Sequence, residues 1–149
     1  MLLTPRPALS GTQTFLRHGR YSAAIASVGA SLRSLRFDDR DLIIPFTPDE
    51  VRPAYHDAVL APWPNRVIDG HYSFQGTTHQ LSITEPARGH ALHGLLVWQD
   101  WSVESCTTSA VVLSSRLVAQ ARAPSLGSAL LARDCPAGHR TRRGRGSLL

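Results

Sequence analysis

The chain has 149 residues, of which 42% are hydrophobic and 18% charged, which fits one globular domain and excludes a disordered or fibrous chain. The net charge of +5 lies in residues 121–149, which hold six arginines and one acid, whereas residues 1–120 hold ten of each. A neutral main part argues against a nucleic-acid partner, and no apolar run is long enough for a membrane partner. The apolar N-terminal stretch is short and interrupted by two prolines, so we predict no signal peptide and a cytoplasmic protein.

From Gly11 to about Val118 the pattern predicts a mostly β protein made of short strands separated by turns. No segment in this part has a helical period of useful length. Residues 67–83 favour a strand, a glycine turn and a second strand, with Tyr72 and Phe74 on one face. The predicted strand regions are residues 14–37, 42–46, 67–83, 97–105 and 110–119, and loops are predicted at 38–41, 47–53 and 84–94.

The last part of the chain has a different composition. Residues 121–149 contain no Phe, Trp or Tyr, and we predict a disordered or weakly helical tail, with two turns of helix at residues 126–134. The restricted alphabet also raises the hypothesis that the chain leaves its proper reading frame near Gln120; an ordinary basic tail is the alternative. We therefore divide the chain into an N-terminal arm (1–10), a β-rich portion (11–120) and an Arg-rich tail (121–149).

One segment, LAPWPNRVIDG, places two prolines and Trp63 directly before Asn65 and Arg66. Proline fixes φ and gives up a backbone donor, so this segment predicts a rigid loop that presents the Asn-Arg pair before a strand. Such a pair suits recognition of a hydroxyl-rich ligand, although an ion pair from Arg66 to Asp69 or Asp57 is an alternative. Trp63 is either a stacking surface for sugar C–H groups or a core residue.

Two histidines lie close together in RGHALHGLLVW. His90 and His93 have the spacing of a metal-binding pair, but no third ligand is obvious, and Cys106 and Cys135 share no ligand spacing. We therefore predict no metal site. His93 precedes Gly94, which allows a sharp turn and a close ligand approach, and an imidazole exchanges hydrogen bonds with hydroxyls near neutral pH.

These motifs, taken in order, resemble the N-terminal half of bacterial-type aldose 1-epimerases, also called galactose mutarotases. The motifs are Asn65-Arg66, the hairpin sequence GHYSFQG at residues 70–76, Leu92-His93-Gly94 and Trp98. The resemblance covers residues 11–118. It implies an all-β fold, an antiparallel β-sandwich of the galactose mutarotase-like supersandwich type, of which this chain holds an incomplete portion.

The resemblance also implies the activity, which is interconversion of the α and β anomers of an aldose by acid–base ring opening, without a cofactor. The implied partner is an aldohexose. Asn65 and Arg66 would bind its hydroxyls, Trp63 would stack on it, and His93 would orient the ring oxygen and could serve in part as an acid.

The family's general-acid histidine motif and its C-terminal glutamate base have no counterpart in this sequence. We therefore expect a poor catalyst and keep two alternatives to an isomerase. One is a non-catalytic carbohydrate-binding β-domain, the remnant of an epimerase. The other is an adaptor that uses the Arg-rich tail to bind nucleic acid or an acidic partner, which the neutral charge of residues 1–120 disfavours.

Overall fold

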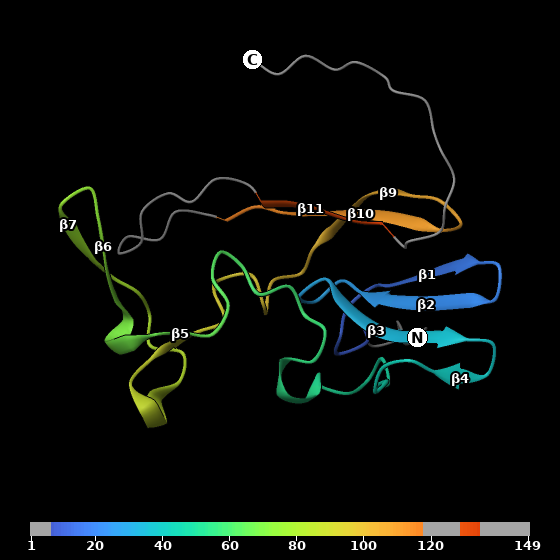
Figure 1. The fold of residues 1–149 in the computed structure, drawn as a ribbon, viewed down its shortest axis with the longest axis horizontal. Helices are drawn as coiled ribbons and strands as arrows, with labels where there is room; N and C mark the ends of the chain where they lie inside the picture. The colour runs from blue at the N-terminus through green and yellow to red at the C-terminus, as the bar shows by residue number, and fades with distance from the viewer. Residues whose placement is uncertain (1–6, 118–128, 135–149) are drawn as a thin grey trace, which may run out of the picture.

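The computed structural model describes residues 7–117 and 129–134 (Figure 1). Within these residues the regular structure consists of strands and three single 3-10 turns, so the all-β class predicted from the sequence is confirmed. No helix among them has the length and apolar character needed to cross a bilayer. The strands are β1 (Gln13–His18), β2 (Tyr21–Ala26), β3 (Ser31–Phe37), β4 (Arg40–Asp41), β5 (Arg66–Val67), β6 (His71–Phe74), β7 (Thr77–Gln80), β8 (Ala91–Leu92), β9 (Ser102–Cys106), β10 (Ala110–Ser115) and β11 (Ala129–Asp134). The 3-10 turns are Pro53–Tyr55, Ile68–Gly70 and Pro86–Arg88.

The first sheet is an antiparallel meander in the order β1-β2-β3-β4. β1 and β2 pair over their full length, from Gln13 opposite Ala26 to His18 opposite Tyr21. Gly19 closes the hairpin between them with a φ of 56°, a left-handed conformation that glycine adopts without strain. The alternation predicted for residues 14–37 thus gives three consecutive strands.

The second sheet has the order β11-β10-β9. In β10 every second residue is buried, namely Val111, Leu113 and Ser115, which is the pattern of a strand with one face on the core. β11 pairs antiparallel to β10 along its whole length. The helix predicted for residues 126–134 is therefore wrong for 129–134, because the open edge of β10 supplies backbone partners that outweigh the helix preference of an Ala-Leu run. The rest of the predicted tail, 121–128 and 135–149, lies outside the described residues.

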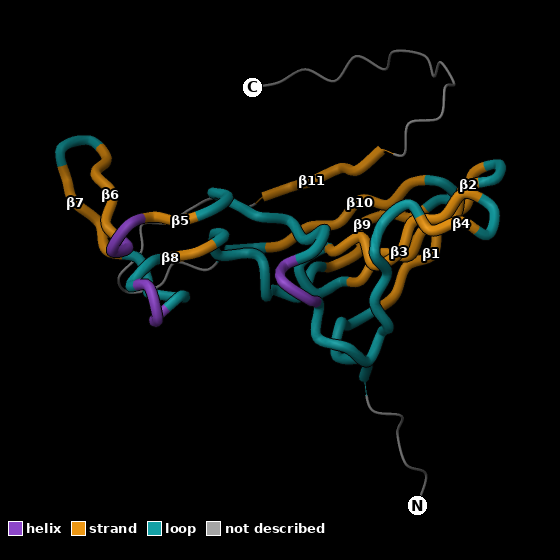
Figure 2. The backbone as a smooth tube through the Cα atoms, turned by 60° about the horizontal axis from the view of Figure 1, so that its bottom comes forward, coloured by secondary structure: helices purple, strands orange, loops and turns teal. Residues whose placement is uncertain are grey.

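The two sheets share one hydrophobic cluster. Leu16 of β1 and Ile25 of β2 belong to the same cluster as Val111 and Leu113 of β10. Figures 1 and 2 show β9 and β10 beside the β1–β4 sheet, with the β6–β7 hairpin at the opposite end of the molecule. The core therefore lies between the two larger sheets, and the short strands β5 to β8 extend away from it.

Trp101 and Leu96 complete this core from the segment that leads into β9. Trp101 is 2% exposed, and its Nε1 donates to the carbonyl oxygen of Leu96 at 3.3 Å. Residues 97 and 98 form a turn and Asp100 forms an isolated bridge with Val28, so the strand predicted at 97–105 begins only at Ser102. A buried indole needs an acceptor for its N–H, and the turn supplies one.

The predicted strand at residues 42–46 is wrong. The N–H of Leu42 still donates to the carbonyl oxygen of Leu35 at 2.8 Å, but Pro45 has no N–H with which to continue a ladder. Ile44 is 71% exposed, so the apolar run does not pack as a strand would. The N–H of Phe46 also donates to the carbonyl oxygen of Arg33 in β3, at 3.3 Å, so the segment follows β3 without forming a continuous ladder.

A buried arginine joins the β2–β3 turn to the segment before Trp98. Arg52 is 5% exposed and donates to the carbonyl oxygens of Val28 and Val97, at 3.1 and 2.8 Å, and to Ser31 Oγ at 2.6 Å. Burial lowers the pKa of Arg52. Its guanidinium carbon lies 4.8 Å from the ring centre of Trp98. Arg52 is therefore an internal cross-link whose terminal nitrogens bind neutral acceptors and whose plane lies against an aromatic face, while its buried Nε has no hydrogen-bond partner among the described residues.

Truncating the core at its most buried leucine should destabilise the chain. Leu96 is 0% exposed, and Leu96→Ala should lower the free energy of unfolding by about 2–5 kcal/mol. Leu42, at 46% exposure, provides a matched control, and Leu42→Ala should stay within about 0.5 kcal/mol of the wild type. Urea denaturation followed by tryptophan fluorescence measures both. Equal losses would show that residue 96 does not lie in the core.

Candidate functional site

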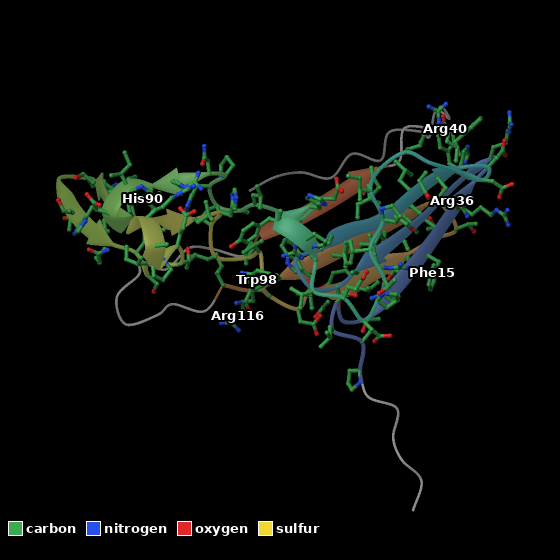
Figure 3. All side chains as sticks on the ribbon, turned by 90° about the horizontal axis from the view of Figure 1, so that it is seen from below. Phe15, Arg36, Arg40, His90, Trp98 and Arg116 are labelled. Carbon is green, nitrogen blue, oxygen red and sulfur yellow. The ribbon has the colours of Figure 1, made fainter. Side chains whose placement is uncertain are left out.

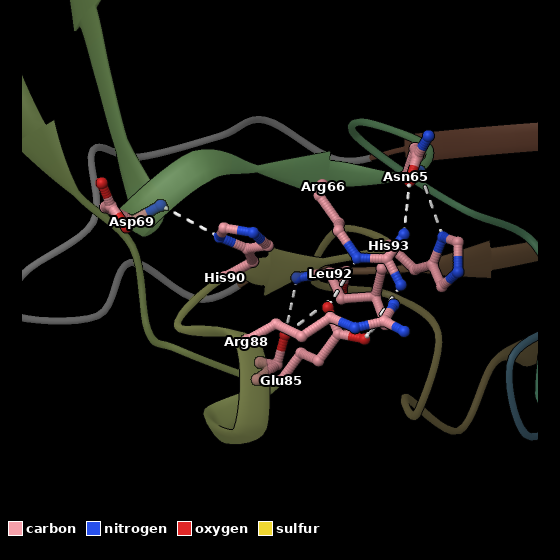
Figure 4. A network of polar contacts seen from close by, with 9 residues as sticks. Asn65, Arg66, Asp69, Glu85, Arg88, His90, Leu92 and His93 are labelled. Carbon is pink, nitrogen blue, oxygen red and sulfur yellow. Dashed lines mark hydrogen bonds and ion pairs between the residues drawn. The ribbon is translucent and has the colours of Figure 1, made fainter.

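The predicted site residues meet at a ladder only two residues long. β5 and β8 pair antiparallel through Arg66 opposite Leu92 and Val67 opposite Ala91. At one end of the ladder the N–H of His93 donates to the carbonyl oxygen of Asn65 at 2.9 Å, and the N–H of Asn65 donates to His93 Nδ1 at 3.1 Å (Figure 4). The two motifs singled out in the sequence therefore bind each other directly.

The other end of the ladder repeats this arrangement with the second histidine. The backbone N–H of Asp69 donates to His90 Nδ1 at 3.3 Å. Both Nδ1 atoms of the His-x-x-His pair are thus occupied by backbone donors at opposite ends of β8. No group of three or more metal-ligating side chains is found among the residues that the structure describes.

The glycine after His93 allows the stiff loop to pack against this segment. Gly94 has a φ of 76°, and a Cβ at this position would overlap the carbonyl oxygen of Ala61. That oxygen accepts hydrogen bonds from the N–H groups of Leu95 and Leu96, at 2.8 and 3.2 Å. The peptide bond between Ala61 and Pro62 is cis. Only a residue without a side chain permits this backbone contact, which explains the glycine in the Leu-His-Gly motif.

His93 is a neutral imidazole with a fixed tautomer. Because Nδ1 accepts a backbone hydrogen bond, the ring proton lies on Nε2, which is left to donate. Burial lowers the pKa of His93 from its ordinary value of 6.5, and the charge of Arg66 lowers it further, whereas Glu85 opposes them. The ring of Tyr55 packs edge-on against that of His93, with 4.7 Å between centroids.

Arg66 pairs with a carboxylate that the sequence did not indicate. Its Nε and one terminal nitrogen donate to the two oxygens of Glu85 at 2.6 and 2.9 Å, and its other terminal nitrogen donates to Asn65 Oδ1 at 3.2 Å. These hydrogen bonds lower the pKa of Glu85 and raise that of Arg66. The sequence analysis gave an ion pair of Arg66 with Asp69 or Asp57 as an alternative. Arg66 does form an ion pair, but its partner is Glu85.

The tryptophans lie differently from one another. Trp98, labelled in Figure 3, is 53% exposed. Its ring centre lies 5.6 Å from that of Tyr55, whose ring also packs against His93. Trp63 is half-buried, and its Nε1 finds no hydrogen-bond partner among the described residues. The sequence did not indicate Tyr55 or Glu85 as site residues. The resemblance named Trp98, the aromatic residue that follows the Leu-His-Gly motif, but no motif included Tyr55.

Three residues of the site have a left-handed backbone. Tyr55, Asn65 and His93 have φ values of 61°, 59° and 60°. Asparagine and histidine tolerate this region better than most residues, and such conformations gather at functional sites. The fold thus aims the side chains at a cost in local backbone energy.

Comparison with known sequences shows the family to which this chain belongs. A family model described as aldose 1-epimerase matches residues 13–122. The uncharacterized protein YihR of Escherichia coli K12 is 43% identical over 108 residues, which are 72% of this chain and 35% of YihR. The chain belongs to the aldose 1-epimerase family.

Solved structures support the same fold. A GalM/aldose epimerase homologue from C. elegans superposes with a TM-score of 0.62 at 23% identity, over 71% of this chain and 36% of its own. A galactose 1-epimerase from Lactobacillus acidophilus NCFM gives a TM-score of 0.55 at 16% identity, over 68% and 32%. The chain thus spans about a third of the length of these relatives.

The contact between Gly94 and Ala61 can be tested against a second glycine. Gly76, in the β6–β7 turn, has nearly the same φ (77° against 76°) but nothing within 4 Å of an added Cβ. Gly76→Ala should cost about 1–2 kcal/mol for the left-handed backbone alone. Gly94→Ala should cost about 1–3 kcal/mol more, because the 61–62 backbone must move. Urea unfolding measures both, and equal costs would contradict the close approach.

Proposed function

We propose that Asn65, Arg66 and His93 bind an aldohexose and form the sugar-orienting side of an anomer-interconverting site. The observation that carries this proposal is the mutual fixing of the three side chains at the end of the β5–β8 ladder. Each presents N–H groups, and hydroxyl and ring oxygens of a sugar are the acceptors that match them. Membership of the aldose 1-epimerase family supports a sugar as the ligand.

The donors available to a sugar are the N–H groups of Arg66, His93 and Asn65 that are not used within the site. A guanidinium has five N–H groups, and Arg66 uses three of them on Glu85 and Asn65. Two remain, one on each terminal nitrogen. His93 offers the N–H on Nε2, and the amide nitrogen of Asn65 offers its own, because Oδ1 accepts from Arg66. The cluster is therefore a preorganised set of donors.

An aromatic surface lies beside these donors. Aromatic faces pack on the apolar C–H side of a pyranose while its hydroxyls bind polar groups. Trp98 is favoured for this role by its exposure and by its link through Tyr55 to His93. Trp63, in the stiff loop, is the second candidate.

The chemistry assigned to these residues is binding and orientation. Ring opening needs a base for the anomeric hydroxyl and an acid for the ring oxygen. A neutral imidazole donating from Nε2 orients an oxygen but is a weak acid, so His93 suits the orienting role. Glu85 is a weak base, since two hydrogen bonds from Arg66 lower its pKa. The non-catalytic carbohydrate-binding domain therefore stands as the second candidate function.

Removing the donors should weaken sugar binding without unfolding the chain. Arg66→Ala should raise the dissociation constant for galactose or glucose about 10- to 100-fold, and His93→Ala about 2- to 10-fold, as expected for charged and neutral hydrogen bonds. Arg40→Ala and His18→Ala, which lie outside the site, should leave the dissociation constant unchanged. Isothermal titration calorimetry measures the constants and circular dichroism monitors the fold. Equal affinity of wild type and both site variants would refute the proposed binding role.

Optical rotation distinguishes an enzyme from a binding domain. With purified chain and freshly dissolved α-galactose, we expect mutarotation to be accelerated by less than about 10²-fold over buffer. A well-placed acid or base contributes about 10²–10⁴-fold each, and the cluster supplies neither in an active form. A larger acceleration that Glu85→Gln abolishes would show that Glu85 is the base and would contradict this assignment.

A further inference from the structure

The site contains a carboxylate to which no role in binding has been assigned. We propose that Glu85 is a positioning residue that holds the Arg66 guanidinium in the orientation in which its two free N–H groups reach a sugar. This inference rests on the proposed sugar-binding role of Arg66. Three independent features support it: the geometry of the pair, the way Glu85 itself is held, and the charge of the pair beside His93.

The pair has the geometry of a bidentate fork. Two parallel hydrogen bonds, from Arg66 Nε to Glu85 Oε2 at 2.6 Å and from a terminal nitrogen to Oε1 at 2.9 Å, fix the plane of the guanidinium. The side chains of Arg66 and Glu85 are 34% and 19% exposed. Ion pairs with this much access to solvent contribute little to folding, so the orientation is the main consequence of the pair.

Glu85 is itself held from several sides. Its backbone forms an isolated bridge with His90. The N–H of Glu85 donates to the carbonyl oxygen of His90 at 3.0 Å, and the N–H of His90 donates to the carbonyl oxygen of Glu85 at 3.3 Å. The 3-10 turn Pro86–Arg88 follows, and the N–H of Arg88 donates to the backbone carbonyl oxygen of Glu85 at 3.1 Å. The Oγ1 of Thr84, the preceding residue, accepts a hydrogen bond from the N–H of Leu92 at 2.7 Å.

Leu92 is also the ladder partner of Arg66. The loop from Thr84 to Leu92 is thus closed onto the same strand pair that carries Arg66, and the carboxylate is supplied from a fixed backbone (Figure 4). An arginine side chain otherwise samples many rotamers, and ordering it on binding lowers affinity. Glu85 removes that cost before the ligand arrives.

The charge of Glu85 also acts on His93. Arg66 lowers the pKa of His93, and Glu85 raises it; Tyr55, whose ring packs against His93, is the other titratable neighbour. Loss of the Glu85 charge should therefore lower the pKa of His93. A purely structural role for Glu85 would not predict this change, so it is a readout that does not depend on sugar.

The test uses the full chain with galactose as the probe. Glu85→Ala should raise the dissociation constant about 2- to 10-fold in the wild-type background, the cost of ordering one long side chain on binding, and by less than 2-fold in the Arg66→Ala background. Glu85→Gln, which keeps the shape, should lower the pKa of His93 in an NMR titration. Glu104→Gln, an exposed glutamate of β9 bonded to Ser114, is the matched control for both measurements.

The failures are distinguishable. If Arg66→Ala weakens binding but Glu85→Ala does not, or if Glu85→Ala weakens it equally without Arg66, the positioning role is wrong and the proposed function stands. If Arg66→Ala binds galactose as the wild type does, both are wrong. An unchanged His93 pKa in Glu85→Gln would overturn the coupling of the three groups, whether or not sugar binds.

Discussion

The carbonyl oxygen of Ala61 accepts two backbone N–H groups, from Leu95 and Leu96, across a gap that only Gly94 leaves open. Leu96 is fully buried in the core between the two larger sheets. One residue before Gly94, His93 exchanges two hydrogen bonds with Asn65. A single close backbone approach therefore ties the core to the site, and the orientation of the stiff loop follows from it.

Two arginines of this framework are held in different ways. The terminal nitrogens of Arg52 bind carbonyl oxygens and a hydroxyl beside the face of Trp98, whereas Arg66 pairs with a carboxylate at the surface. The arrangement of Arg52 suits a permanent cross-link, because Arg52 is buried and its partners are groups of the chain itself. The second leaves part of the guanidinium free, and its partner also moderates the effect of that cation on the pKa of His93.

The sequence predicted those features that depend on neighbours along the chain. The composition and turns of residues 14–37 indicated the strand region that holds β1, β2 and β3, and the prolines and glycine of the two motifs indicated the loops. The strand predicted at residues 42–46 is absent although β3 lies beside it, because Pro45 has no N–H with which to continue the ladder. The partner of Arg66 was missed because it lies far along the chain. Asp69 is three residues away and Glu85 nineteen, and only the register of β5 with β8 makes the distant one the neighbour.

β11 shows this limit most clearly. Its Ala-Leu composition favours helix in isolation, and its strand state depends on an edge of β10 that local pattern cannot reveal. The site was more predictable than the tail. The Asn-Arg and Leu-His-Gly motifs are short, yet the structure brings them into direct contact through Asn65 and His93.

The tautomer of His93 has a consequence for which ligands the site accepts. With Nδ1 turned to the backbone, the ring offers a ligand only a proton, and Arg66 and the amide nitrogen of Asn65 likewise offer only protons. A neutral sugar meets this surface with lone pairs at each contact. An amino sugar that places an ammonium group there would bring donors against donors and a cation against Arg66. Under the proposed function, the direction in which one imidazole is turned would contribute to selectivity against such ligands.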